Sequence, residues 1–207
     1  MKPVFFSWSR PVAAGALALL LSSCALLQPE KVEPTSRFAL EAAFEPAPVT
    51  GTAAQVLLVA PPTARSGLDR AAMLYVTRPY EMQSFSRSEW VDAPARMLAP
   101  LLVDVLERVG GFRVVQAPSG VTATLRLDTE IGALQQEFTT SPSRVRFALR
   151  AQLVEVAARR LVAARELEAV EEAPSDDPYG GVVAANRAVA RLLRELAEWA
   201  RAQGAGS

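Results

Sequence analysis

Apolar and polar residues alternate along several segments of the chain, and this pattern predicts β-strands. Segments 123–131 and 145–153 both carry apolar residues at every second position. The run 55–60 is almost entirely apolar and ends at two prolines, which is typical of a buried central strand. Past Gly132 the apolar positions change phase, so we expect a β-bulge at this glycine.

Shorter apolar runs predict the remaining strands. They cover residues 37–44, 73–77, 80–85 and 112–115. Segments 73–77 and 80–85 flank Arg78-Pro79, which indicates a hairpin-like connection between them.

Two segments carry apolar residues at three- and four-residue spacings and predict amphipathic helices. The first follows Asp92, a favoured N-cap, and ends at Gly110-Gly111, while Pro100 predicts a kink or marks its true start. The second spans 182–202. Strands with two such helices predict an α/β fold of the α+β kind, a two-layer sandwich of a mixed or antiparallel sheet and two helices.

Residues 155–172 are ambiguous. Their Ala, Arg, Glu and Leu content favours a helix by intrinsic propensity. Residues 158–160 also fit the tip of a hairpin, with 161–171 as the returning strand. The residues alone favour the helix.

The N-terminus has the three parts of an export signal. Lys2 and Arg10 precede an apolar run, 12–21, which is too short for a bilayer core that takes roughly 20 residues. The run ends in Leu21-Ser22-Ser23-Cys24, which resembles a lipobox, so Cys24 is the predicted lipid attachment site. The alternatives are a secretory peptide with a chance cysteine, or an N-terminal membrane helix. The predicted organisation is a signal peptide (1–23), a lipidated tether (24–36), one periplasmic domain (37–202) and a disordered tail (203–207).

The lipobox resemblance implies a diacylglycerol thioether at Cys24 and an acylated amino terminus. Such multiple acylation makes membrane attachment effectively permanent. Residue 25 is Ala rather than Asp, a pattern that resembles lipoproteins passed on to the outer membrane. We therefore expect a protein anchored at the periplasmic face of the outer membrane.

The amino-acid composition excludes several classes of catalytic and metal-binding site. The chain has one cysteine and no histidine, which excludes an internal disulfide, a Ser-His-Asp triad, a Cys-His pair and a His-based zinc site. Its 22 basic and 22 acidic residues cancel, which argues against nucleic acid as a partner. The acidic pairs Glu171-Glu172 and Asp176-Asp177 fit a solvated loop better than a calcium site. We expect no metal, no cofactor and no enzymatic activity.

Four residues are candidate partner contacts: Trp90, Tyr80, Phe85 and Met82. Exposed aromatic residues are enriched in interface hot spots, although Trp90 also fits a core anchor at the helix start. Arg144, Arg146 and Arg150 share one strand face, which is either simply solvated or pairs with an acidic partner or lipid headgroups.

The chain resembles the ABC-type transport auxiliary lipoprotein family, which includes the lipoprotein of the paraquat-inducible operon. The matching positions run through most of the domain: 57–61, Leu68-Asp69-Arg70 with Tyr75, 80–85 with Trp90, Leu98, Leu102 and Leu106, 111–114, Phe138, 143–149, and 184–188 with Trp199. One departure is Ala71, where many relatives carry proline.

The resemblance implies a role beside a partner. Such lipoproteins accompany a permease, an ATPase and a membrane-anchored MCE-domain protein that together move lipids or other hydrophobic molecules across the envelope. The family offers no catalytic residues, and it implies a strand within 155–172. A homo-oligomer would suit this adaptor role. The alternative function is a scaffold or activator of cell-wall synthesis or outer-membrane assembly. An anchored hydrolase is disfavoured by the missing histidine.

Overall fold

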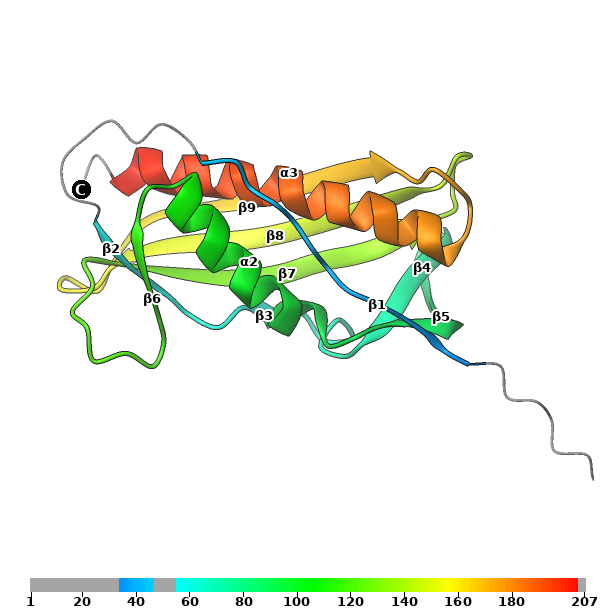
Figure 1. Ribbon diagram of the computed structural model, residues 1–207, viewed down its shortest axis with the longest axis horizontal. Coiled ribbons are helices and arrows are strands. Elements are labelled where there is room, and N and C mark those ends of the chain that lie inside the picture. The colour runs from blue at the N-terminus through cyan, green and yellow to red at the C-terminus, as the bar shows by residue number, and fades with distance from the viewer. Residues whose placement is uncertain (1–33, 47–54, 205–207) are drawn as a thin grey trace, which may run out of the picture. The chain divides into compact units, whose positions relative to one another are not determined.

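The computed structural model describes residues 34–46 and 55–204. Nine strands form one sheet, and two helices pack on it (Figure 1). The strands are β1 (Ser36–Phe38), β2 (Val56–Val59), β3 (Thr63–Ala64), β4 (Ala72–Arg78), β5 (Glu81–Trp90), β6 (Arg113–Gln116), β7 (Leu125–Glu137), β8 (Arg144–Glu155) and β9 (Arg160–Glu172), and the helices are α2 (Pro94–Arg108) and α3 (Pro178–Gly204). The predicted two-layer α+β fold with a mixed sheet is confirmed.

The long strand β7 organises the sheet. Along one edge it pairs antiparallel with β8, which pairs antiparallel with β9. Its other edge takes three short strands in turn, all parallel: β2 at Leu125, β3 at Glu130 and β4 from Gln135 onward. β2 also pairs with β6, while β4 leads on to β5 and β1. The sheet is therefore mixed because β7 has an antiparallel neighbour along one edge and parallel neighbours along the other.

The predicted bulge at Gly132 is confirmed. The β7–β8 register shifts between Ile131 and Ala133. As a result Ile131 and Leu134 are both buried although they are three residues apart. The bulge lets one strand keep its apolar side chains on the same face over its whole length.

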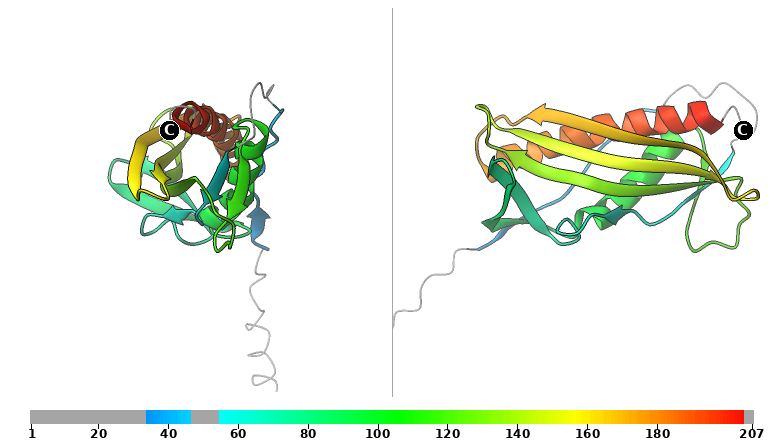
Figure 2. Two further views of the ribbon diagram at one scale, coloured as in Figure 1. Left: turned by 90° about the vertical axis from the view of Figure 1, so that its left-hand side faces the viewer. Right: turned by 180° about the vertical axis from the view of Figure 1, so that it is seen from behind.

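Both helices cover the same face of the sheet. Phe147 and Leu153 of β8 and Leu193 of α3 are fully buried between the two layers. Seen from behind, β7, β8 and β9 lie in front of α3, with no helix over their outer face (Figure 2). This uncovered face carries the polar half of each alternating strand.

The ambiguous segment is a strand, as the family resemblance implied and against the helical propensity of its residues. β9 pairs with β8 from Arg144 opposite Glu172 to Glu155 opposite Arg160. Tertiary pairing over twelve residues outweighs propensity differences of a few tenths of a kcal/mol each, roughly. The turn between the strands includes Arg159, which has a φ of 50°.

Other boundaries differ from the expectation. The first strand is only Ser36–Phe38 instead of 37–44. α2 begins at Pro94 and continues through Pro100. The N-cap is Ala93 instead of the predicted Asp92, which accepts a hydrogen bond from the Ala93 N–H at 2.7 Å and pairs with Arg96. α3 runs on to Gly204, whose carbonyl accepts a hydrogen bond from Gln55 Nε2 at 3.1 Å, two residues beyond the predicted end of the domain.

Candidate functional site

The β4–β5 turn holds Tyr80 in an unusual position. Tyr80 has a φ of 68°, in the left-handed region, and its side chain is fully exposed. Arg78 and Glu81 on either side of the turn form an ion pair with each other. An aromatic residue that gains no burial is thus held outward in a costly conformation, which points to a role outside the core.

Met82 extends the exposed surface of the hairpin. Its side chain is 54% exposed. Tyr80, Met82 and Thr139 line a surface groove of about 570 Å³. The groove therefore joins the β4–β5 turn to the chain that follows β7.

The other two predicted contacts are placed differently. Trp90 ends β5, is only 4% exposed and belongs to the core, which matches its alternative interpretation as a core anchor. Phe85 is half-buried, with its ring centroid 4.5 Å from that of Tyr75 and 6.4 Å from that of Phe138. Of the four residues, Tyr80 and Met82 are the two whose side chains are open to a partner.

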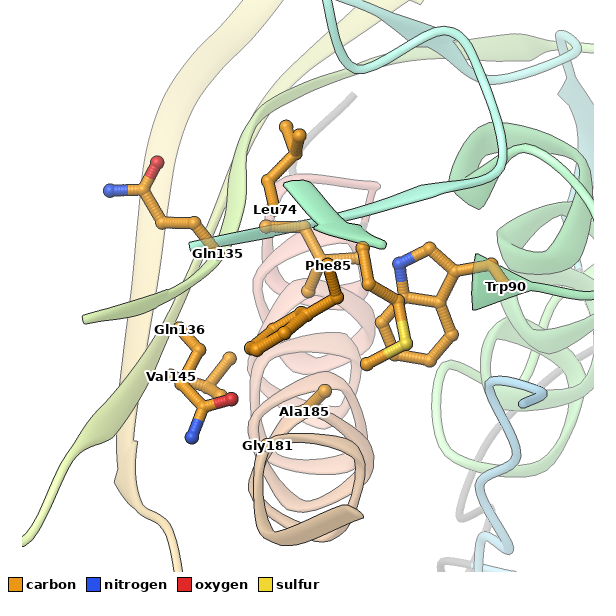
Figure 3. Close-up of a pocket in the computed structure, with 10 residues that line it drawn as sticks. Leu74, Phe85, Trp90, Gln135, Gln136, Val145, Gly181 and Ala185 are labelled. Carbon is orange, nitrogen blue, oxygen red and sulfur yellow. The ribbon is translucent and has the colours of Figure 1, made fainter. Parts of the chain in front are cut away.

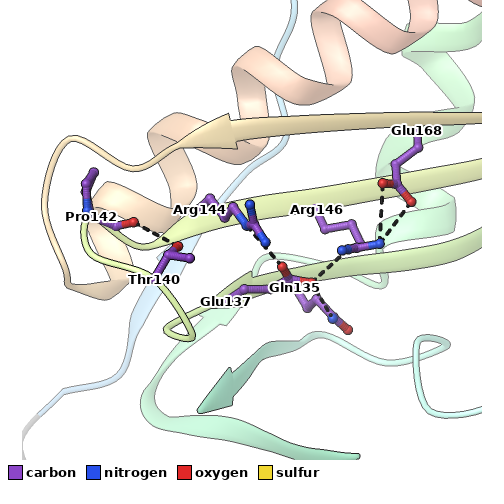
Figure 4. Close-up of polar contacts among 7 residues, drawn as sticks. All are labelled: Gln135, Glu137, Thr140, Pro142, Arg144, Arg146 and Glu168. Carbon is purple, nitrogen blue, oxygen red and sulfur yellow. Dashed lines mark hydrogen bonds and ion pairs between the residues drawn. The ribbon is translucent and has the colours of Figure 1, made fainter. Parts of the chain in front are cut away.

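A charged network begins beside this groove. Arg146 Nε lies 2.8 Å and Arg144 Nε 3.4 Å from the carboxylate of Glu137, and Gln135 Nε2 donates to it at 3.2 Å. Arg146 also contacts Glu168 at 3.1 Å (Figure 4). Burial alone would raise the pKa of Glu137, but the hydrogen bonds from Arg146 and Gln135 and the two positive charges outweigh it and lower that pKa. Two of the three arginines predicted on one strand face are thus ion-paired.

The third arginine, Arg150, lies in a shallow groove of about 480 Å³ on the uncovered face. Gly132, Ala133 and Ala148 are small residues that line it. Glu130, Arg150 and Glu166 follow one another in register across β7, β8 and β9. These three side chains and that of Arg65 make no ion pair within the described part of the chain. The groove therefore presents charged groups of both signs that are free to meet a partner.

Sequence reasoning missed a polar cluster at the start of α3, in which Gln136 and Ser143 are buried and Asp176 and Asp177 are exposed. Gln136 Nε2 donates to Ser143 Oγ at 2.9 Å and to the Asp177 carbonyl at 3.2 Å. The Ser143 N–H donates to Asp176 Oδ1 and the Gly180 N–H to Asp177 Oδ1, both at 2.7 Å. These backbone hydrogen bonds lower the pKa of both aspartates. In the sequence, Gln136 is one of several polar residues in a strand with alternating apolar and polar positions. Nothing in the neighbouring residues therefore predicts that its side chain is buried.

The cluster borders a very small cavity. Trp90, Phe85 and Gln136 lie around Gly181 and Ala185 of α3 (Figure 3). About 10 Å³ is free there, close to the room that one water molecule needs. This site is a packed junction between β7 and α3 rather than a ligand pocket.

Comparison with known proteins decides the family. The family described as "ABC-type transport auxiliary lipoprotein component" matches residues 38–197. The chain belongs to this family. No match was found among curated proteins.

Solved structures show the same fold for this auxiliary lipoprotein. Protein XCC0632 from Xanthomonas campestris, of the family DUF330, is 21% identical with a TM-score of 0.76, over 83% of this chain and 98% of that one. The hypothetical protein CT253 from Chlamydia trachomatis is 11% identical with a TM-score of 0.51, over 74% of this chain and 99% of that one. The family is one of transport auxiliary components and is not a known enzyme family.

The described part of the auxiliary lipoprotein contains no group of three acidic or cysteine residues that could hold a metal ion. None of the helices within 34–46 and 55–204 is long and apolar enough to cross a membrane. The predicted lipid attachment site, Cys24, lies outside the described residues.

Proposed function

We propose that this auxiliary lipoprotein is a non-catalytic adaptor of an ABC/MCE-type transport system that moves lipids or other hydrophobic molecules across the envelope. It is anchored through Cys24 to the periplasmic face of the outer membrane, and its protein partner is the MCE-domain protein of the transporter. The observation that carries the proposal is the family match over residues 38–197. The lipobox-like sequence that ends at Cys24 supports the anchor.

We place the MCE-domain protein on the uncovered face of the sheet. Both helices leave this face open, and Glu130, Arg150, Glu166 and Arg65 offer charges there that form no ion pair with another residue of 34–46 or 55–204. Charges of both signs in a fixed row can select one partner and reject others whose charges do not match. Nothing in this role requires an acid, a base or a nucleophile.

Copurification from solubilised membranes tests the proposal. The full-length protein should recover the MCE-domain protein. Arg150→Glu should weaken this recovery, because it places three carboxylates in one row across the sheet. Arg194→Glu is the matched control, since Arg194 is exposed on α3, on the other side of the sheet. Recovery of peptidoglycan synthases in place of the MCE-domain protein would favour the cell-wall alternative and refute the adaptor.

A further inference from the structure

The two exposed tyrosines of the described residues lie at one end of the domain, together with Met82. Tyr80 is fully exposed, Tyr179 is 63% exposed, and Met82 is 54% exposed. We call this the aromatic end: the β4–β5 turn, the β7–β8 turn and the first turn of α3, which lie at the same end in both views (Figures 1 and 2).

Contacts link these segments to one another. Tyr80 and Thr139 line the same groove, which joins the β4–β5 turn to the β7–β8 turn. Ser143 then bonds Asp176 just before α3, and the Tyr179 ring lies 6.3 Å from that of Phe38 in β1. These contacts connect the β4–β5 turn, the β7–β8 turn and the first turn of α3 to the rest of the aromatic end.

The described domain also begins at this end. β1 starts at Ser36 and runs parallel to β5, with Ser36 opposite Ser88. The residues between Cys24 and Ser36 number eleven and extend at most roughly 40 Å. The strand β7 alone, at 13 residues, spans about the same length. An anchor at Cys24 thus holds the aromatic end within about one domain length of its bilayer.

We propose that the aromatic end rests in the lipid headgroup layer of the membrane that holds the Cys24 anchor. The proposal rests on the lipidation of Cys24. Tyrosine suits this layer because its ring is apolar while its hydroxyl reaches water and headgroups. The ion pair of Arg78 with Glu81 leaves the turn without net charge, so Tyr80 and Met82 enter the layer without carrying an unpaired charge with them.

This contact orients the domain. The opposite end, with the β8–β9 turn, then points away from the membrane, and the uncovered sheet face stands upright and accessible from the side. The strained backbone of Tyr80 has a function in this arrangement, because it holds the ring outward at the point nearest the lipid.

Fluorescence quenching in vesicles tests the proposal on the full-length lipidated protein. Cys24 is the sole cysteine and is blocked by its lipid, so one added cysteine can be labelled selectively. A fluorophore on Met82→Cys reports on the aromatic end. A fluorophore on Val156→Cys is the control, since Val156 is also exposed but lies in the β8–β9 turn. The vesicles contain phosphatidylethanolamine and phosphatidylglycerol, with a fraction of headgroup-nitroxide lipid as quencher.

The Met82 label should lose much of its fluorescence and the Val156 label should not. Replacing both Tyr80 and Tyr179 by Asn in the labelled Met82→Cys protein should reduce that loss. Equal quenching of the two labels in protein that floats with the vesicles would overturn the proposal while leaving the anchor intact. Failure to float would instead refute lipidation, and the proposal with it. A Met82 label that stays unquenched in vesicles but is shielded by the MCE-domain protein would assign the aromatic end to a protein partner.

Discussion

The junction of Gly181 with Gln136 gives a sharp test of the structure, because alanine at this position should destabilise the protein although it favours helices. Alanine is better than glycine in a helix by about 1 kcal/mol. A Cβ on Gly181, however, would lie 2.8 Å from Gln136 Cδ and closer still to Oε1. Gln136 is 3% exposed and cannot move into solvent without leaving Ser143 and Asp177.

The size of the destabilisation follows from the hydrogen bonds that Gln136 would lose. Two buried hydrogen bonds contribute about 0.5–1.5 kcal/mol each, and stranding the buried amide costs about 1–3 kcal/mol more. Set against the gain in helix propensity, Gly181→Ala should lower the free energy of unfolding by about 1–5 kcal/mol. Urea denaturation followed by circular dichroism measures this difference.

A double-mutant cycle isolates the contact. In a Gln136→Ala background the clash is absent, so Gly181→Ala should be neutral or stabilising by up to about 1 kcal/mol. The sign of the effect therefore reverses between the two backgrounds. If Gly181→Ala changed stability equally in both, the close packing of α3 on Gln136 would be refuted.

Three further predictions address other parts of the fold. Tyr80→Gly should raise the free energy of unfolding by up to about 1 kcal/mol, since it removes left-handed strain without loss of burial; a lower melting temperature would contradict this. Phe147→Ala should cost about 3–5 kcal/mol in urea denaturation, because Phe147 is fully buried, and a cost below about 1 kcal/mol would show that it is not in the core. Glu137 has a lowered pKa, so the stability that it contributes is present above its usual pKa of 4.5 and is lost as the pH falls below it. Glu137→Gln should therefore be less stable at pH 7 and less sensitive to acid, and an unchanged pH profile would refute the network.

Periodicity predicted most of the fold. Alternation in 123–131 and 145–153 identified β7 and β8, and the phase change at Gly132 identified the bulge, because both depend on which face of a strand meets the core. The spacing of apolar residues likewise identified α2 and α3.

Features that depend on distant neighbours were not predictable in this way. β9 has helical composition and is a strand because it pairs with β8. Trp90 and Tyr80 were both candidate partner contacts, and the burial of Trp90 agrees with its interpretation as a core anchor, whereas the left-handed backbone that holds Tyr80 outward left no mark in the sequence. Gln136 donates a hydrogen bond to a carbonyl 41 positions away, so its role is evident only in the folded structure.

Mass spectrometry of the N-terminal peptide tests the central claim most directly, because the anchor at Cys24 underlies both the adaptor role and the orientation of the aromatic end. Protein purified from the envelope should begin at Cys24, with a diacylglycerol thioether on its sulfur and an acyl chain on its amino group. An unmodified Cys24, or a mature terminus at another residue, would contradict the account.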